Sequence, residues 1–289
     1  MVYLMVLVMI LISIFLRKKC TIGNKKITDK FTIIFSSICL ILLSACRAVP
    51  EASDYLTNYI RMIEVKQMSW NDVFQQNELL HQIFRKLISV IFDNPQWYFF
   101  FSALIIVGVF CWFALRYSGD ACLAIFLFYT VFIYIDSNNI TRQCIAVALT
   151  IISQRFIIER KIIPFFLTIF AAMSFHISAI VYIPMYFLAN ISFTRRSTKF
   201  YLILSCVILL MQNTLFKTVQ QFIYTDYTGN TYGTATSNVL RLIIPLFCTL
   251  IMIYYQNKRQ NQLSYKFSDL ERNYVNNIIN HGTTLYVLC

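Results

Sequence analysis

The sequence predicts an all-α fold, a polytopic transmembrane helical bundle of about nine or ten spans with a long extracytoplasmic loop after the second span. Of its 289 residues, 58% are hydrophobic and 13% are charged, and the mean hydropathy is +0.62. This balance leaves too little polar surface to cover a water-soluble domain. The apolar residues also form long continuous runs, and basic residues gather in alternate connections between those runs.

Several runs approach the roughly 20 residues that a bilayer crossing requires. They lie at about 2–16, 31–46, 96–115, 121–135, 143–158, 161–175, 177–192, 200–216 and 239–255. A tenth begins near residue 274 and stops before it could cross, which suggests a truncated C-terminus. The first run has no basic residue before it and no small-residue cleavage site after it, so we expect a retained helix. We expect one integral membrane domain over residues 1–289, with its extracytoplasmic loop at 47–95.

The basic residues predict the orientation of the chain. Together with Arg155 near the end of the fifth run, the connections after the first, third, fifth, seventh and ninth runs hold 17 of the 25 Lys and Arg but 5 of the 13 Asp and Glu. We therefore expect that side to face the cytoplasm and the N-terminus to face outward. Because insertion alone requires this asymmetry, the net charge of +12 needs no nucleic-acid partner to explain it.

Polar residues at the outer ends of the predicted spans, or in outer connections, could share one chamber. They are Arg47, Asp54, Arg142, His176 and Arg241. Each has a structural interpretation, since arginine can be a snorkelling anchor, an Asp-Tyr pair a helix cap, and a lone histidine an interior residue. Arg142 is the hardest to explain in that way. A charge within a span costs about 2.5–3.5 kcal/mol and generally faces a partner or a water-filled cavity.

An outward-facing chamber lined with arginines favours an anionic ligand, because the guanidinium fork matches phosphate oxygens in bidentate fashion. A lipid-linked pyrophosphate is a membrane-borne ligand of this kind. Its departure needs fixed positive charge where negative charge develops, a role that suits Arg142 and Arg241. A carboxylate or an imidazole would assist the attacking sugar hydroxyl. Asp54 and His176 are the candidates, with Glu51 behind them.

The sequence gives no support for cofactor, metal or nucleotide chemistry. Its nine cysteines include no CxxC pair, so we expect neither a disulfide framework nor a thiolate metal site. The outer acids show no ligand spacing, and no HExxH, Walker A, GxGxxG or GxSxG pattern occurs. We therefore expect no cofactor and no metal.

Three stretches carry a family resemblance: "CRAVPEASDYLTNYI", "NELLHQIFRKLISVIFDNPQWYFFFSALI" and "NNITRQCIAVALTIISQRFIIERKIIPFFLTIFAAMSFHISAIVYIP". They contain an Arg followed by Asp-Tyr, an Asn-x-x-Arg-Gln element that opens a span, a basic inner hairpin and a Phe-His-x-Ser-Ala element. In this order and spacing, over roughly residues 1–255, the sequence resembles the EpsG-like branch of the Wzy-type polysaccharide polymerases. The matching residues are Arg47, Asp54, Tyr55, Asn139, Arg142, Gln143, His176 and Ser178.

The resemblance implies extracytoplasmic polymerisation of oligosaccharide repeat units carried on undecaprenyl pyrophosphate, for capsule, exopolysaccharide or O-antigen synthesis. It implies a multi-pass protein of the bacterial cytoplasmic membrane. Its partners would be the lipid-linked oligosaccharide, membrane lipid, a chain-length regulator and a flippase, with no nucleic acid. Arg142, Asp54 and His176 would be catalytic. The residues expected to bind the pyrophosphate or the sugar are Arg47, Arg241, Tyr55, Asn139, Gln143 and Glu51.

Asn139 is expected to cap the helix that holds Arg142 in its first turn, so that the helix N-terminus and the guanidinium point at one phosphate. Three other functions remain open. A flippase or other transporter should offer polar features that reach the midplane and the cytoplasmic side. A membrane acyltransferase could use His176 as a base. A non-catalytic subunit of a polysaccharide assembly complex would only bind, whereas a lipid-linked glycan ligase shares the polymerase chemistry.

Overall fold

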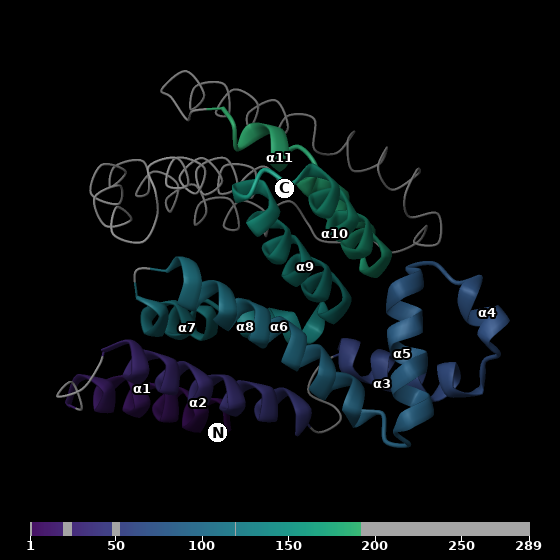
Figure 1. Ribbon diagram of the computed structural model, residues 1–289. Coiled ribbons are helices and arrows are strands. Elements are labelled where there is room, and N and C mark those ends of the chain that lie inside the picture. Colours follow the sequence, from purple (N-terminus) through teal and green to yellow (C-terminus); the bar gives the residue numbers. More distant parts are fainter. Residues whose placement is uncertain (1, 20–24, 48–52, 119, 192–289) are drawn as a thin grey trace, which may run out of the picture. The chain divides into compact units, whose positions relative to one another are not determined.

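The structure is a computed structural model that describes residues 2–19, 25–47, 53–118 and 120–191. Every regular element in those ranges is a helix, which confirms the predicted all-α class for this part of the chain (Figure 1). Contacts divide the chain into one unit of residues 1–183 and another of residues 184–289. The candidate site described below lies in the first unit.

The helices of the first unit follow one another closely along the chain. They are α1 (Val2–Lys19), α2 (Lys25–Ala45), α3 (Ser53–Gln67), α4 (Trp70–Phe74), α5 (Leu79–Ile91), α6 (Gln96–Tyr117), α7 (Ala121–Thr130), α8 (Ile133–Asn139), α9 (Thr141–Ile158), α10 (Ile162–Phe175) and the 3-10 helix η1 (Ile177–Tyr182). The second unit contributes α11 (Met185–Leu188) to the described residues.

The main core of the first unit forms where α2 and α6 pack on each other and on α1, α7 and α9. α1 and α2 run side by side in Figure 1. The aliphatic side chains at the centre of this core are buried, among them Ile10, Ile33, Leu40, Val107 and Ile125. The outward faces of α1 and α2 are equally apolar, with Leu4, Phe15 and Phe31 exposed. This pattern on both faces is typical of helices surrounded by lipid.

One described helix, α6, is long and apolar enough to cross a membrane without a break. Its 22 residues extend over about 33 Å, close to the thickness of a hydrocarbon core. α7 and α8 would form a second crossing if these two helices, bent by 54°, are taken as one. The other spans stay predictions, and those at 200–216, at 239–255 and from 274 lie outside the described residues.

Two predicted spans are broken in the structure. The run at 121–135 divides between α7 and α8 because Phe132 adopts a φ of 65°, a left-handed conformation that interrupts a helix. The amide of Val131 still donates to the carbonyl of Leu127 at 2.9 Å, as an apolar environment requires of backbone groups. The run at 177–192 forms η1 and then α11, because Pro184 has no amide hydrogen with which to continue the helix.

The described part of the expected outer loop at 47–95 is largely helical, since it contains α3, α4 and α5. A lysine connects two of these helices. Nζ of Lys86 donates to three backbone carbonyls at the end of α3 and in the turn that follows it. They are those of Val65 at 3.1 Å, Lys66 at 3.0 Å and Met68 at 2.7 Å. The low average hydropathy of this segment concealed its helices, because their apolar residues recur on one face only.

α5 is amphipathic in the reverse sense to a surface helix of a soluble protein. Its inward face carries His81 and Arg85, both fully buried. Its outward face exposes Leu87, Val90 and Ile91. The helix thus keeps its charged and polar groups against protein and turns its aliphatic groups away from it, an arrangement typical of an apolar surrounding.

The expectation that Asn139 caps the helix of Arg142 is wrong. Asn139 is the last residue of α8, and Ile140 occupies the N-cap position of α9 without a side-chain hydrogen bond. The amide of Ile140 donates to the carbonyl of Asp136 at 3.0 Å, which keeps Asn139 within the last turn of α8. α9 begins at Thr141, so the expectation that Arg142 lies in its first turn is confirmed.

α9 and α10 form a hairpin and lie side by side in Figure 1. At its closed end, Glu159 pairs with Arg155 at 2.5 Å and with Lys161 at 2.9 Å. At its other end, Arg142 lies in the first turn of α9 and His176 follows the last residue of α10. The hairpin therefore brings Arg142 and His176 to the same end of the two helices.

Candidate active site

A glutamate joins two of the three residues that we expected to be catalytic. Oε2 of Glu78 lies 2.6 Å from Nη1 of Arg142, and its Oε1 lies 2.7 Å from Nδ1 of His176. The side chains are partly exposed, by 33% for Arg142, 16% for Glu78 and 15% for His176. The cluster is thus held by protein contacts and still open to a ligand.

Three separate helix ends position this cluster. Glu78 is the N-cap residue of α5, Arg142 lies in the first turn of α9, and His176 is the C-cap residue of α10. The amide of His176 donates to the carbonyl of Ala172 at 2.9 Å, which fixes the backbone from which the imidazole extends. The N-terminal end of α9 adds its own partial positive charge to that of Arg142. An anion at this point would meet both.

The protonation of Glu78 determines which nitrogen of His176 carries hydrogen. Burial raises the pKa of the Glu78 carboxyl, but the hydrogen bond to His176 and the charge of Arg142 together outweigh it, and the pKa lies below its ordinary value. Glu78 is therefore ionised at neutral pH and can only accept hydrogen bonds. Nδ1 of His176 must then be the donor. In the neutral imidazole this leaves the lone pair on Nε2, the nitrogen that can act as a base.

Behind this cluster lies a second, fully buried histidine. Nε2 of His81 is 3.0 Å from the hydroxyl of Tyr98, and its ring lies 6.3 Å from that of Phe175, the residue before His176. Burial, followed by the charges of Arg85 and Arg142, holds the pKa of His81 well below its ordinary value. His81 is thus a neutral packing residue at physiological pH.

Arginines dominate the electrostatics around this site. The guanidinium of Arg85 bonds to Asn58 of α3 and lies 5.3 Å from the centre of the Tyr98 ring. Arg61, Arg85 and Arg142 all act on His81 in the same direction, disfavouring its protonated form. Converging positive charge of this kind attracts anions. The site therefore suits an anionic ligand better than a cationic or neutral one.

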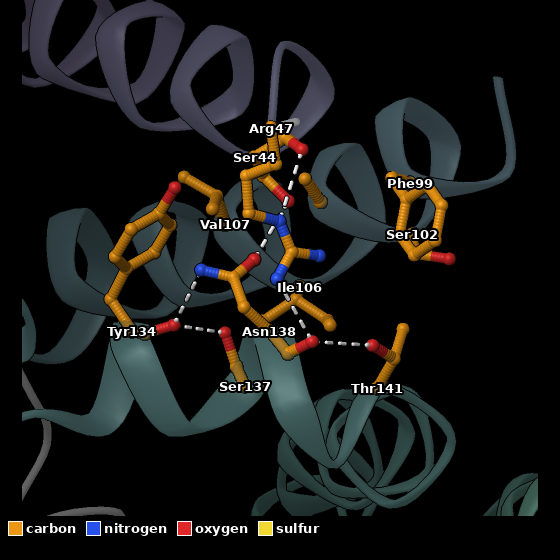
Figure 2. Close-up of a pocket in the computed structure, with 11 residues that line it drawn as sticks. Ser44, Arg47, Phe99, Ser102, Ile106, Val107, Tyr134, Ser137, Asn138 and Thr141 are labelled. Atoms are coloured by element: carbon orange, nitrogen blue, oxygen red, sulfur yellow. Dashed lines mark hydrogen bonds between the residues drawn. The ribbon is translucent and has the colours of Figure 1, made fainter. Parts of the chain in front are cut away.

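Arg47 lies in a second cluster, which Figure 2 shows. Its Nη1 donates to the carbonyl of Asn138 at 3.1 Å and its Nε to that of Ser44 at 3.3 Å. The guanidinium also lies 5.4 Å from the ring centre of Tyr55 and 5.2 Å from that of Phe99. Only 7% of Arg47 is exposed. Its donors thus meet backbone oxygens and its face meets aromatic rings.

Tyr55 supports the same cluster. Its ring stacks on that of Phe99, with centroids 4.4 Å apart, and its hydroxyl donates to Oε1 of Gln96 at 2.6 Å. The amide nitrogen of Gln96 in turn donates to the carbonyl of Arg47 at 2.9 Å. Burial raises the pKa of the Tyr55 phenol, so the hydroxyl stays protonated and keeps this bond. The chain of contacts ties α3 to the start of α6 and the end of α2.

A small cavity lies beside Arg47. Its volume is about 10 Å³, which is room for about one water molecule and not for a sugar ring. Polar and apolar groups line it, including Ser44, Ser102, Tyr134, Asn138 and Thr141 (Figure 2). Ser44 donates to Oδ1 of Asn138 at 2.7 Å, and Nδ2 of Asn138 donates to the carbonyl of Tyr134 at 3.1 Å. The polar groups are largely engaged with one another.

The remaining predicted site residues are placed less completely. Asn139 and Gln143 are half-buried at the junction of α8 and α9, beside Arg142 in the sequence. Asp54 falls in the first turn of α3, and its side chain lies outside the described residues, as do Glu51 and Arg241. The substrate-binding roles of these residues stay predictions. Among the described residues, no group of three or more His, Cys, Asp or Glu could hold a metal ion.

Glu78 was missed at the sequence level. It lies between the exposed Asn77 and the first residue of α5, in a segment that the sequence predicts to be an outer loop. Its partners are far away in the chain, at Arg142 and His176, so no local spacing indicates the contact. The available signal was a lone acid placed directly before a run with helical periodicity, and that signal equally predicts an ordinary helix cap.

The EpsG family model matches residues 30–288 of the chain. The protein belongs to the EpsG family. This confirms the resemblance seen in the sequence, and the family consists of Wzy-type polysaccharide polymerase-like proteins. Comparisons with curated proteins and with solved structures find no match.

Membership of the EpsG family indicates a role in polysaccharide biosynthesis, of a polymerase-like kind. It implies a lipid-linked oligosaccharide substrate in a membrane. The apolar helices agree with this, and together the two observations indicate a membrane protein. The family match gives no information about contacts between residues. The cluster of Glu78, Arg142 and His176 is known only from the structure.

Proposed function

We propose that this EpsG-family protein polymerises undecaprenyl-pyrophosphate-linked oligosaccharide repeat units at the outer face of the bacterial cytoplasmic membrane. The observation that carries the proposal is the meeting of Arg142 and His176 at Glu78, with Nη1 and Nδ1 2.6 and 2.7 Å from its carboxylate oxygens. Glycosyl transfer from a lipid pyrophosphate needs one cation for the leaving group and one base for the acceptor. This cluster contains both.

Arg142 holds the leaving diphosphate. Arginine remains charged and binds phosphate oxygens through two parallel N–H groups. Its position in the first turn of α9 lets the amides of that turn contribute to the same anion. Arg241, outside the described residues, is proposed as a second cation for the diphosphate.

His176 accepts the proton of the acceptor hydroxyl. Its Nδ1 is occupied by Glu78, so Nε2 is the free basic atom. Asp54 remains a second candidate for this role, with Glu51 near it in sequence. Asn139 and Gln143 adjoin Arg142 and would contact the sugar or the diphosphate.

The polypeptide would act as a single multi-pass membrane domain with its N-terminus outside. The Arg142 end of the α9–α10 hairpin would then face outward, and the Glu159 end, with its basic partners, would face the cytoplasm. Lipid-linked substrate would enter from the outer leaflet. A chain-length regulator and a flippase would work with the enzyme in assembling capsule, exopolysaccharide or O-antigen.

The test uses purified full-length protein and the lipid-pyrophosphate repeat unit extracted from the producing cells. Native protein should convert that substrate into a ladder of products on a gel. Arg142→Ala and His176→Ala should give no ladder while accumulating in the membrane at native levels. Arg155→Ala is the matched control, because Arg155 is also paired with a glutamate, at the opposite end of α9. A full ladder from Arg142→Ala would refute the proposal.

A further inference from the structure

Glu78 has an unusual backbone for its residue type. Its φ of 58° and ψ of 54° place it in the left-handed region at the N-cap of α5. Glycine, asparagine and aspartate adopt that region far more readily than glutamate, whose Cβ meets the backbone. Strain of this sort persists where the surrounding structure requires one particular side chain, and it occurs most often at functional sites.

The side chain of Glu78 makes no cap hydrogen bond to α5. The N-cap position of a helix normally uses a side-chain oxygen to satisfy a free amide in its first turn. Here both carboxylate oxygens point instead to Arg142 and His176. The residue thus carries an unfavourable backbone and leaves α5 without a side-chain cap, and what it gains is the contact with two candidate catalytic groups.

Glu159 shows what a structural carboxylate looks like in the same protein. It also pairs with two basic side chains, those of Arg155 and Lys161. Its backbone is ordinary, with a φ of −76° and a ψ of −2°, and it pairs with a residue one helical turn away. Glu78 differs from it in backbone strain and in partners from distant parts of the chain. The difference points to function rather than to a simple ion pair.

We propose that Glu78 is a positioning residue for the polymerase reaction. It holds His176 with hydrogen on Nδ1 and the lone pair on Nε2, and it keeps the Arg142 side chain extended at the site until a diphosphate takes over its guanidinium. The inference rests on the proposed function, because it assigns a role within that reaction. It adds a residue to which the sequence resemblance assigns no role.

In the reaction, the acceptor hydroxyl loses its proton to Nε2 of His176 as its oxygen bonds to the anomeric carbon. The bond from that carbon to the pyrophosphate oxygen breaks, and its electron pair leaves with the undecaprenyl pyrophosphate. The His176 imidazole is then cationic, and the carboxylate of Glu78 lies against its Nδ1–H. Arg142 faces the charge that grows on the leaving group. The proton on Nε2 then passes to water, which restores the base.

The test compares Glu78→Gln, Glu78→Gly and Glu159→Gln in the purified full-length protein, with the extracted lipid-linked repeat unit as substrate. Glu78→Gln keeps the shape and removes the charge, and we expect kcat to fall by about 10²-fold or more with little change in KM. Glu78→Gly relieves the left-handed backbone, so we expect normal or better accumulation together with the same loss of activity. Glu159→Gln should behave as the native protein.

A spectroscopic measurement checks the position of the proton without any turnover. The chain has three histidines, so ¹⁵N shifts of labelled imidazoles can be assigned by substitution. In native protein at alkaline pH, His176 should show hydrogen on Nδ1, and in Glu78→Gln the two tautomers should mix. An unchanged tautomer in Glu78→Gln would overturn the proposal, as would activity within about threefold of native.

Three further outcomes separate this proposal from the function on which it rests. If Glu78→Gln and Glu78→Gly lose activity only in proportion to lost folded protein, Glu78 is structural and the proposal is wrong. If Arg142→Ala is inactive while Glu78→Gln is active, Glu78 has no positioning role but the polymerase assignment stands. If Arg142→Ala is active as well, the assignment of function fails first.

Discussion

Arg47 and Arg142 are both outer-end arginines from the same predicted chamber, but the structure gives them opposite surroundings. Arg47 is 7% exposed, and its contacts include two backbone carbonyls and the faces of two aromatic rings. Arg142 is 33% exposed at its side chain and contacts a carboxylate that also holds a histidine. One arginine is enclosed by groups that cannot leave. The other is partly exposed and is paired with the carboxylate of Glu78.

The difference teaches how to separate two roles that one residue type can fill. A guanidinium that donates to carbonyls and lies against rings in a confined space contributes to stability, and the adjoining cavity has room for only about one water molecule. A partly exposed guanidinium beside the carboxylate of a residue with a strained backbone fits the ligand-binding role proposed for Arg142. We therefore expect substitutions at Arg47 to change folding and substitutions at Arg142 to change turnover.

The largest expected effect comes from exchanging Arg142 for lysine. Arg142→Lys should lose about 10²-fold or more in kcat, because an ammonium group cannot bind two phosphate oxygens side by side. It should accumulate normally, since one cation still faces Glu78. The measurement is ladder formation per folded molecule from the extracted lipid-linked substrate. Activity near the native level in Arg142→Lys would mean that charge alone is required there.

A smaller effect, on stability, is expected at Arg47. Arg47→Ala removes two hydrogen bonds and the contacts with Tyr55 and Phe99, and we expect it to destabilise the protein by about 3 kcal/mol. Thermal unfolding in detergent, followed by fluorescence-detected size exclusion, measures this. The activity of the molecules that remain folded should change by less than about tenfold. If the Arg47→Ala protein is stable but inactive, Arg47 contacts the substrate, and the contrast with Arg142 is wrong.

Much of the fold near the site follows from local patterns in the sequence. The continuous apolar run before Tyr117 predicts α6, and the basic hairpin around Glu159 predicts the turn between α9 and α10. The motif spacing then places Arg142 at the start of one helix and His176 after the other. Hydropathy, helix length and hairpin topology act over short distances, so they can be read without a structure.

The rest depends on contacts between distant segments. Nothing in the sequence around Glu78 indicates that its carboxylate reaches two other helices. The helix break at Phe132 contains no proline or glycine that would predict it. The sequence also predicts that Asn139 caps the helix of Arg142, whereas Ile140 occupies that position. These features arise because tertiary packing overrides local preference. The Glu78 contacts and the junction of α8 and α9 lie at the candidate site, where such exceptions are expected.

Lowering the pH should change the stabilisation by the Glu78 cluster and not that by the Arg47 cluster. The Glu78 carboxyl has a folded-state pKa below its ordinary value of 4.5, so its contribution to stability is fully present above that value. It is lost as pH falls through the lower, folded pKa, where the carboxylate is protonated. The stability difference between native protein and Glu78→Gln, on the order of 1 kcal/mol at neutral pH, should shrink in that range. The two carbonyls and two rings that contact Arg47 do not titrate there, so the stabilisation that comes from these contacts should not change over that range.

The smallest expected effect concerns Tyr55, for which the sequence predicts a substrate contact. Tyr55→Phe keeps the ring that stacks on Phe99 and removes only the hydroxyl that donates to Gln96. If that hydroxyl serves the Arg47 cluster, the substitution should cost about 1 kcal/mol of stability and leave the product ladder unchanged. Shorter products from a fully folded Tyr55→Phe protein would instead show that the hydroxyl meets the sugar. The cluster around Arg47 would then be part of the substrate site, and the distinction between a structural Arg47 and a functional Arg142 would no longer hold.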